Sequence, residues 1–264
     1  MEKTSKVVCI IQARMASSRL PGKVLENICG HPMLYWVVTR AAEAKLIDEI
    51  IVATTLDNSD DPISKWCLDH NINCFRGDGF DVLDRYYQTA KNFQADVVVR
   101  LTADCPLIDP DLIDEVVSVF FEKEVDFAAN RLPPPYTRSY PIGLDIEVAS
   151  FSVLEKAWHQ ASLPFEREHV MPYLYSVKDR FSTIILDAEK DYSDRRWTVD
   201  TTEDLEFIRA LFNKLNCRLG FTWREVISIL EENPELADIN AEVVHRSFLD
   251  VDDRSSIKLG EEEE

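Results

Sequence analysis

The chain has 264 residues, and its 48 acidic residues against 29 lysines and arginines give a formal net charge of −19. This charge argues against a general nucleic-acid-binding protein, which needs a basic face large enough to follow a phosphate backbone. No apolar run approaches the ~20 residues of a membrane span, and the amino terminus has no signal-peptide pattern, so we expect a cytoplasmic protein without a membrane partner.

The first predicted element is a strand over residues 7–11, a continuous apolar run of the kind that is buried on both faces of a parallel sheet. A loop that contains Arg14, Arg19 and Lys23 follows it. Residues 3–25 hold no acidic residue, although a window of this length should hold about four at the average composition of the chain. A basic loop after a buried strand offers a polyphosphate converging donors and no carboxylate to repel it.

This loop is neither of the two common phosphate-binding motifs. The P-loop pattern needs a glycine where Ser17 stands and a hydroxyl where Val24 stands, and the dinucleotide fingerprint G-x-G-x-x-G is missing. A P-loop ATPase and a Rossmann dehydrogenase are therefore disfavoured. A solvated connection whose charges have no function stays open as an alternative.

Helix and strand patterns alternate after this loop. We predict strands over residues 49–54, 72–75 and 96–101, and helices over residues 33–44, 63–70, 81–93 and 110–122. This order predicts a largely parallel sheet with helices on both faces. Ligands of such sheets bind beyond the carboxyl ends of the strands. Four segments should therefore share one rim: 12–23, 54–57, 76–79 and 102–106.

The second half of the chain departs from this regular order. The proline-rich run over residues 131–136 cannot be helical and predicts an extended excursion. The other predicted elements are strands over residues 126–129, 143–148, 181–186 and 196–200 and helices over residues 150–162, 166–177, 202–215 and 222–232. We expect one domain over residues 1–245, in which residues 132–194 form a small lobe over the site. An acidic, solvated tail over residues 246–264 is expected to follow.

Six cysteines are scattered along the chain without a C-x-x-C pair. In an intracellular protein such cysteines are expected to be reduced packing residues, and a zinc site is not indicated.

Two aspartates follow predicted strands. Asp104 comes just after the strand over residues 96–101, and Asp200 ends the strand over residues 196–200. If both strands belong to the sheet, both carboxylates reach the same rim and could share one Mg²⁺, a hard ion held by carboxylates and phosphate oxygens. Either aspartate alone is more often a helix cap or a turn residue.

The pattern I-I-Q-A-R-M-x-S-S-R-L-P-G-K-V-L over residues 10–25 resembles the signature of the cytidylyltransferases that make CMP-activated sugars. Within that family it is similar to the branch of spore-coat polysaccharide cytidylyltransferases. The resemblance covers the chain to about residue 240 and implies a Rossmann-like fold of the nucleotide-diphospho-sugar transferase type. It also implies CTP as co-substrate, Mg²⁺ as cofactor, and a homodimer that the covering lobe supports.

By this resemblance, the basic loop holds the CTP triphosphate. Arg14, Arg19 and Lys23 take the catalytic roles, with Lys23 best placed to meet charge that develops at the α-phosphate. The segments D-C-P-L-I and V-D-T-x-E-D-L resemble the family's metal-binding segments, which makes Asp104 and Asp200 the expected metal pair. The implied nucleotide-binding residues are Gln12, Ala13, Arg14, Ser18, Gly22, Lys23, Arg76, Arg85 and Asp104. An ion pair among Asp81, Asp84 and Arg85 stays an equally good interpretation of the last arginine.

Two further segments resemble the spore-coat-like branch: Y-P-I-G-L-D-I-E over residues 140–147 and R-E-H-V-M-P-Y over residues 167–173. They imply acceptor-binding roles for Asp145, Glu147, Arg167 and His169. Asp145 and Glu147 are two residues apart on a predicted strand, so their side chains share one face, near Arg138. Two such carboxylates suit sugar hydroxyls or an amine. Arg167 and His169 suit a carboxylate or phosphate, although a packing role for His169 stays open.

The implied reaction is transfer of CMP from CTP to an acidic keto-sugar, such as a sialic-acid-like or 3-deoxy-octulosonate-like sugar, with release of pyrophosphate, in surface polysaccharide biosynthesis. One alternative is a nucleotidyltransferase that uses a phosphate or phosphonate acceptor. Another is a nucleotide-sugar-dependent glycosyltransferase or a non-catalytic nucleotide-binding protein. A glycosyltransferase would want a D-x-D motif on the rim, and none follows the strand that ends at Leu101.

Overall fold

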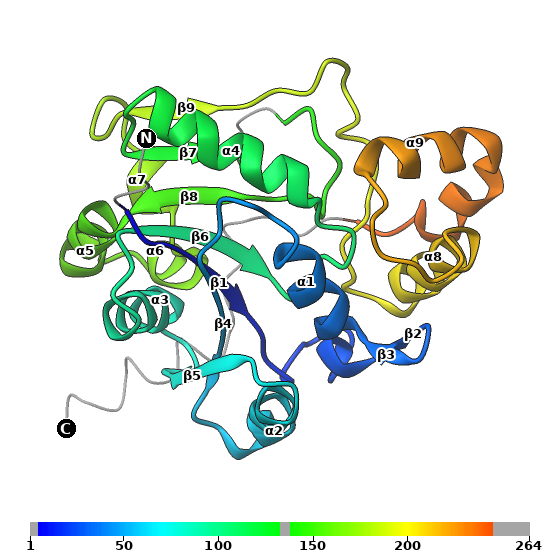
Figure 1. The fold of residues 1–264 in the computed structure, drawn as a ribbon, viewed down its shortest axis with the longest axis horizontal. Helices are drawn as coiled ribbons and strands as arrows, with labels where there is room; N and C mark the ends of the chain where they lie inside the picture. The colour runs from blue at the N-terminus through cyan, green and yellow to red at the C-terminus, as the bar shows by residue number, and fades with distance from the viewer. Residues whose placement is uncertain (1–4, 133–137, 245–264) are drawn as a thin grey trace.

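The computed structural model of the chain describes residues 5–132 and 138–244. The predicted acidic tail and residues 133–136 of the predicted excursion lie outside this part. A seven-stranded sheet in the order β5-β4-β1-β6-β8-β7-β9 forms the centre (Figure 1). Its strands are β1 (Val7–Gln12), β4 (Glu49–Thr55), β5 (Asn73–Gly77), β6 (Val97–Thr102), β7 (Phe127–Ala129), β8 (Glu147–Ser150) and β9 (Thr183–Ile185). Only β8 is antiparallel to its neighbours in this sheet, so the predicted mostly parallel α/β architecture is confirmed.

Strand β1 lies in the interior of the sheet because both of its faces are apolar. It pairs with β4 on one side and with β6 on the other. Successive side chains of a strand point to opposite faces, so Val7, Cys9 and Ile11 join one core cluster while Val8 and Ile10 join the other. All five side chains are fully buried, as predicted for a strand covered on both faces.

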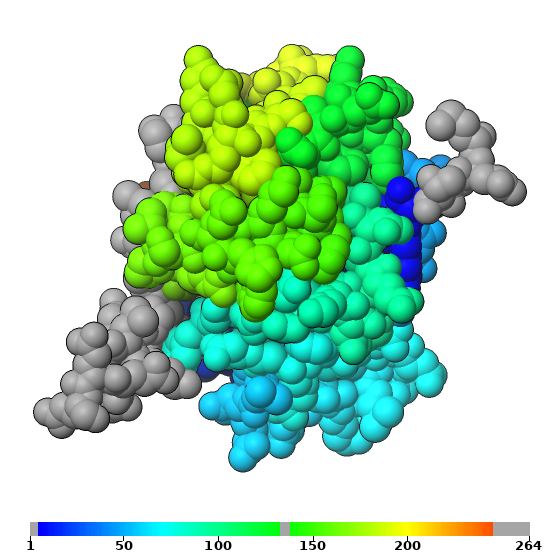
Figure 2. Space-filling model, turned by 90° about the vertical axis from the view of Figure 1, so that its left-hand side faces the viewer, coloured from blue at the N-terminus to red at the C-terminus, as the bar shows by residue number. Residues whose placement is uncertain are grey.

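Helices cover both faces of the sheet. One core cluster takes residues from α1, α2, α4, α8 and α9, and the other takes residues from α3, α5 and α7. Figure 2 shows the second side, where the green to yellow-green segment that carries α5, α6 and α7 lies over the cyan segment that carries α3. The helices are α1 (Met33–Ala41), α2 (Asp61–Asp69), α3 (Val82–Asn92), α4 (Pro110–Glu122), α5 (Phe151–Gln160), α6 (Pro164–His169), α7 (Pro172–Tyr175), α8 (Thr202–Lys214) and α9 (Trp223–Glu232).

Helix α4 has the bounds that the sequence predicts. Two residues mark its start. Pro110 suits the first helical position, where the missing amide hydrogen costs no hydrogen bond. The Asp109 carboxylate accepts a hydrogen bond from the Leu112 amide (3.1 Å) and so caps the first turn.

Three predicted elements of the second half differ from the structure. The predicted helix over residues 166–177 is divided into α6 and α7, because Val170 has a φ of 73° and Pro172 lacks an amide hydrogen. The predicted strand over residues 143–148 begins only at Glu147. The predicted strand over residues 196–200 lies outside the sheet and meets Ile142 through an isolated bridge at Arg196.

Gly143 explains why these last two segments run together. Its φ is +106°, and an added Cβ would lie 2.6 Å from the Thr198 backbone nitrogen. Only a residue without a side chain permits this approach of the two backbones. The segment before β8 therefore crosses residues 197–198 before it enters the sheet.

Among the helices of the described residues, none combines the length and the apolar character that a bilayer crossing requires. The division into one domain over residues 1–245 with a covering lobe over residues 132–194 stays a prediction.

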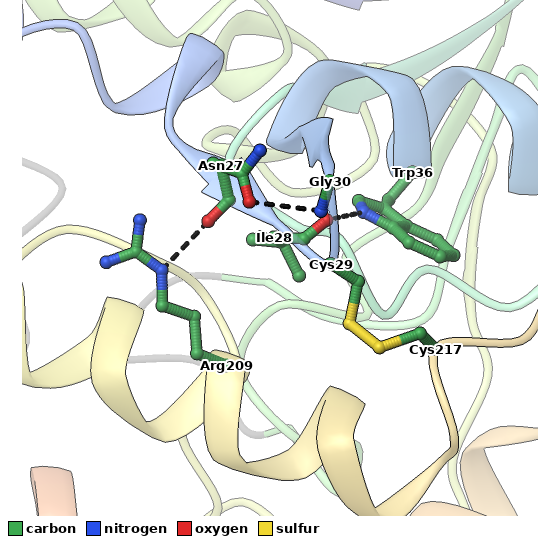
Figure 3. Close-up of a disulfide and its surroundings, with 7 residues drawn as sticks. All are labelled: Asn27, Ile28, Cys29, Gly30, Trp36, Arg209 and Cys217. Atoms are coloured by element: carbon green, nitrogen blue, oxygen red, sulfur yellow. Dashed lines mark hydrogen bonds between the residues drawn. A yellow bond between two sulfur atoms is a disulfide. The ribbon is translucent and has the colours of Figure 1, made fainter.

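The prediction that all cysteines are reduced is wrong for one pair. Cys29 and Cys217 form a disulfide, with their Cα atoms 5.8 Å apart (Figure 3). Cys29 follows β2 (Asn27–Ile28), which pairs with β3 (His31–Pro32), and Cys217 follows α8. Arg209 of α8 donates to the Asn27 carbonyl (2.8 Å), so the helix packs beside the hairpin and brings the cysteines together. A separation of 188 residues hides this pairing from any local pattern.

We expect the disulfide to contribute about 2–4 kcal/mol to the free energy of unfolding, because it restricts a long loop in the unfolded chain. Dithiothreitol should therefore lower the urea midpoint of the wild-type protein. The Cys29→Ser/Cys217→Ser double variant should show the lower midpoint with or without the reductant. A wild-type midpoint that does not respond to reduction would contradict this prediction.

Candidate active site

The basic loop after β1 folds around the Met15 carbonyl, which accepts hydrogen bonds from the amides of Ser17 (2.9 Å) and Gly22 (2.8 Å). Gly22 has a φ of +76°, a left-handed conformation that glycine adopts without penalty. Lys23 comes next and begins the short 3-10 helix η1 (Lys23–Leu25). The turn at Gly22 thus ends the loop, and Lys23 follows it as the first residue of η1.

Asp60 anchors this loop to the end of β4. Its buried carboxylate accepts hydrogen bonds from the Met15 amide (2.7 Å), the Thr55 amide (3.2 Å) and the Thr55 hydroxyl (2.5 Å). The sequence analysis missed this residue, because Asp60 is one of several aspartates in a turn and no local pattern distinguishes it.

Lys23 brings the predicted basic loop and the two predicted aspartates together. Its ammonium nitrogen lies 2.7 Å from Asp104 Oδ2, 2.9 Å from Asp200 Oδ1 and 2.7 Å from the Val199 carbonyl oxygen. Burial acts to lower the pKa of Lys23, but the charges of Asp104 and Asp200 hold it above its ordinary value. The two carboxylates, 96 residues apart in sequence, thus converge on one cation.

Asp104 and Asp200 meet because residues 197–200 run beside the turn after β6. The Val199 amide donates to the Asp104 carbonyl (2.9 Å), and the Thr198 hydroxyl donates to the same oxygen (3.3 Å). The predicted convergence at the rim is therefore present, although only Asp104 follows a strand of the sheet.

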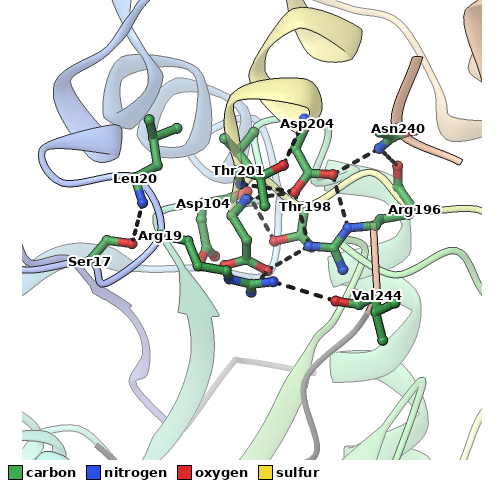
Figure 4. Close-up of polar contacts among 12 residues, drawn as sticks. Ser17, Arg19, Leu20, Asp104, Arg196, Thr198, Thr201, Asp204, Asn240 and Val244 are labelled. Carbon is green, nitrogen blue, oxygen red and sulfur yellow. Dashed lines mark hydrogen bonds and ion pairs between the residues drawn. The ribbon is translucent and has the colours of Figure 1, made fainter. Parts of the chain in front are cut away.

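Asp200 is surrounded by cations. Besides Lys23, Arg19 lies 2.8 Å and Arg196 2.7 Å from Asp200 Oδ2. Burial acts to raise the pKa of Asp200, but the charges of Lys23 and Arg19 and the hydrogen bond from Arg196 hold it well below its ordinary value. Arg19 also donates to the Val244 carbonyl (3.5 Å; Figure 4).

Arg196 and Asp204 are functional candidates that the sequence analysis missed. Asp204 is fully buried and binds Arg196 at both oxygens, 2.9 Å from Nε and 3.0 Å from Nη2. The Asn240 side chain, at the end of the 3-10 helix η3 (Pro234–Asn240), donates to Asp204 Oδ1 (2.9 Å; Figure 4). This chain of contacts fixes the guanidinium group that holds Asp200.

The other predicted nucleotide-binding residues lie along the same rim. Ala13 donates its amide to the Ala53 carbonyl (3.1 Å), and Ser18 is exposed. Arg85 is buried and donates to the Asp78 carbonyl (2.5 Å). Burial, with a smaller contribution from the charge of Arg14, lowers the pKa of Arg85 to about 10, whereas Tyr86 and nearby aspartates act to raise it. Arg76 is bound to the carbonyls of Thr55 and Asp57 (2.8 Å each) and to Asp61 (2.7 Å).

The predicted acceptor residues Asp145 and Glu147 are both paired with arginines. Arg131 lies 3.4 Å and Arg138 3.1 Å from the Asp145 carboxylate. Glu147 forms a buried ion pair with Arg100, which also donates to the Gln12 side chain (3.0 and 3.2 Å). The side chains beside these carboxylates are therefore guanidinium groups.

Arg167 and His169, the other predicted acceptor residues, lie on α6 rather than beside Asp145. Arg167 is paired with Asp81 at the start of α3 (2.5 Å) and donates to the Trp158 carbonyl (2.7 Å). The structure thus divides the predicted acceptor set between two places. Asp81 is bound to Arg167, and Asp84 accepts a hydrogen bond from Trp158 Nε1 (2.8 Å). Both aspartates of the alternative ion pair with Arg85 therefore have other partners.

The residues around Lys23 fit a hard divalent cation. Across residues 5–132 and 138–244, no group of three or more histidine, cysteine or acidic side chains is arranged to hold a metal ion. Mg²⁺, however, commonly uses one or two carboxylates and takes its other ligands from substrate phosphates and water. Asp104 Oδ2 and Asp200 Oδ1 already converge on a single cation, the Lys23 ammonium.

Comparisons with known proteins give a consistent result. Residues 8–236 match the family model described as "Cytidylyltransferase". The chain is 31% identical over 238 residues to the spore coat polysaccharide biosynthesis protein SpsF of Bacillus subtilis, which covers 88% of this chain and 96% of SpsF. A cytidylyltransferase structure from Leptospira borgpetersenii superposes with a TM-score of 0.83 at 33% identity, covering 91% of this chain and 100% of that one. A CMP:2-keto-3-deoxy-manno-octonic acid synthetase complexed with CTP shares the fold, with a TM-score of 0.61 at 22% identity over 80% of this chain and 99% of that one.

Proposed function

Since the chain belongs to the cytidylyltransferase family, we propose that it transfers CMP from CTP to a small anionic acceptor, with release of pyrophosphate. The observation that carries this proposal is the convergence of Lys23, Asp104 and Asp200 on one point of the rim. A basic loop alone could bind any phosphate, whereas cations and carboxylates together suit phosphoryl transfer, which depends on positioning and electrostatics.

In the proposed reaction, an acceptor oxygen attacks the α-phosphorus of CTP in line. The bond from that phosphorus to the oxygen that bridges to the β-phosphate breaks, and pyrophosphate leaves with this oxygen. An acceptor hydroxyl gives up its proton to water. Arg14 and Arg19 would bind and orient the triphosphate. Lys23 would neutralise charge that develops at the α-phosphate. Asp104 and Asp200 would hold Mg²⁺, which supplies further neutralisation of the phosphate oxygens when bound. Arg196, fixed by Asp204, would keep the Asp200 carboxylate in place.

The arginines around Asp145 support an acceptor with a negative charge. Arg131 and Arg138 share one carboxylate, so this group of three carries a net positive charge. Among the described residues, Arg138 Nη1 is buried without a hydrogen-bond partner. Burial, and then the charges of Asp104 and Asp145, raise the pKa of the Cys105 thiol.

These guanidinium groups suit the carboxylate of a keto-acid sugar, and they suit a phosphate or phosphonate acceptor as the second candidate. The family membership argues against the glycosyltransferase and the non-catalytic alternatives. Surface polysaccharide biosynthesis is the proposed role, by analogy with the spore coat relative. A homodimer and a cytoplasmic location also stay proposals, which light scattering and cell fractionation can check.

A pyrophosphate-release assay tests the proposed function. Purified protein with Mg²⁺ and CTP should release pyrophosphate with one class in a panel of acidic sugars, sugar phosphates and phosphonates. CTP with Mg²⁺ should also raise the melting temperature more than a UDP-sugar does. Silence across the panel with all four nucleotides would contradict the proposal.

We expect Arg138→Gln to raise the KM for the acceptor about 10- to 100-fold, because one charge-assisted hydrogen bond is lost. The KM for CTP should stay close to that of the wild type. Arg224→Gln, which changes an exposed arginine elsewhere, serves as the matched control. An unchanged acceptor KM in Arg138→Gln would remove this residue from the acceptor site.

A further inference from the structure

The Lys23 ammonium fills the space between the two carboxylates that we propose as metal ligands. Its three contacts, to Asp104 Oδ2, Asp200 Oδ1 and the Val199 carbonyl, match the three N–H donors of an ammonium group. Lys23 has an exposed fraction of only 8%. In this arrangement the ammonium is therefore already bound and cannot reach a triphosphate.

The charges of the cluster are balanced without any ligand. Three cations, Lys23, Arg19 and Arg196, are paired with three carboxylates: Asp104 with Lys23, Asp200 with all three cations, and Asp204 with Arg196. A divalent cation that uses Asp104 Oδ2 and Asp200 Oδ1 needs the position that the ammonium occupies, because these same oxygens bind it. The two positive ions would also repel each other at such a distance.

We infer that Lys23 is an internal substitute for the metal ion, and that the site takes up a divalent cation only when a triphosphate draws Lys23 and Arg19 away. This inference rests on the proposed function, since it takes Asp104 and Asp200 as metal ligands. The exchange keeps the charges paired: the phosphates receive Lys23 and Arg19, and the metal ion receives the carboxylates. Arg196 stays in place because Asp204 holds it through two contacts.

Two binding properties follow from this exchange. The nucleotide-free protein has low affinity for divalent cations, although two carboxylates converge in its site. Nucleotide and metal then raise each other's affinity by the same factor, since coupling between two sites is reciprocal. A factor of about 10 to 100 is typical of such coupling.

Mn²⁺ binding followed by electron paramagnetic resonance tests this inference on the full-length, nucleotide-free protein. Lys23→Met keeps an unbranched side chain but removes the charge. It should raise the affinity for Mn²⁺ about 10-fold or more. Lys23→Arg retains the charge and should stay as weak as the wild type. Lys65→Met removes the same charge from an exposed pair with Asp69 and should leave the affinity unchanged.

Three further measurements complete the test. Adding Asp104→Asn to Lys23→Met should abolish the gain, which places the ion in this site. Mn²⁺ should raise the melting temperature of Lys23→Met but not of the wild type, which also shows that the variant folds. With α,β-methylene-CTP, the wild type should bind Mn²⁺ about 10- to 100-fold more tightly than without it.

Equal Mn²⁺ affinity of the nucleotide-free wild type and Lys23→Met would overturn the inference, as would a gain that survives Asp104→Asn. Either result alongside normal pyrophosphate release by the wild type would leave the proposed function intact. A wild type that neither binds CTP nor releases pyrophosphate would instead contradict the proposed function itself.

Discussion

Lys23→Ala should lower kcat for pyrophosphate release by a factor of about 10³, while the chain still folds. The expected loss is large because the ammonium is the charge proposed to meet the α-phosphate during transfer, and alanine offers no donor in its place. Folding should survive, because Asp200 keeps its contacts with Arg19 and Arg196. Steady-state kinetics at saturating CTP and acceptor measure the effect, and circular dichroism checks the fold.

Lys65→Ala is the matched control for this experiment, since it removes an equal charge from an exposed pair on α2. Its kcat should equal that of the wild type. If Lys23→Ala retains a kcat within tenfold of the wild-type value, the catalytic role of Lys23 is wrong.

Asp204→Ala should lower the free energy of unfolding by about 3–5 kcal/mol, because it leaves the buried Arg196 guanidinium without its main counter-charge. The same change removes acceptors from the amides of Asp200 (2.9 Å) and Thr201 (3.1 Å) at the start of α8. The urea midpoint and the slope of the transition together give this free energy.

Two variants separate the buried charge from other causes. Asp204→Leu combined with Arg196→Met replaces the pair with apolar side chains and should recover much of the lost stability. Asp69→Ala breaks an exposed ion pair and should change stability by no more than about 0.5 kcal/mol. A loss below about 1 kcal/mol in Asp204→Ala would contradict a structural role for the buried pair.

The elements that could be predicted from the sequence are those that local pattern decides. The continuous apolar run over residues 7–11 and the cap and proline at Asp109 and Pro110 are sufficient signals without tertiary context. The segment over residues 196–200 shows where such patterns fail. Trp197 and Val199 are buried, as in a strand, but their backbone amides bond to the carbonyls of Ile142 and Asp104. Both partners lie in connecting segments, which no local alternation of apolar residues can reveal.

The candidate site follows the same division. Lys23 and Asp104 could be expected on one rim because the carboxyl ends of parallel strands meet there. Asp204 could not be recognised, because acids in the first turn of a helix are ordinary. Its burial depends on Asn240 in η3, which packs over it from a distant part of the chain. Arg131 also stayed hidden, since only the tertiary approach to Asp145 gives it a partner.

The disulfide between Cys29 and Cys217 closes the chain between them into a covalent ring. Asp104 and Asp200 belong to the ring, whereas Lys23 belongs to the open arm before it. One proteolytic cut inside the ring leaves both pieces tethered, but one cut between Lys23 and Cys29 releases the arm. The carboxylate half of the site is thus secured against a single break in the backbone, and the lysine that completes it is not.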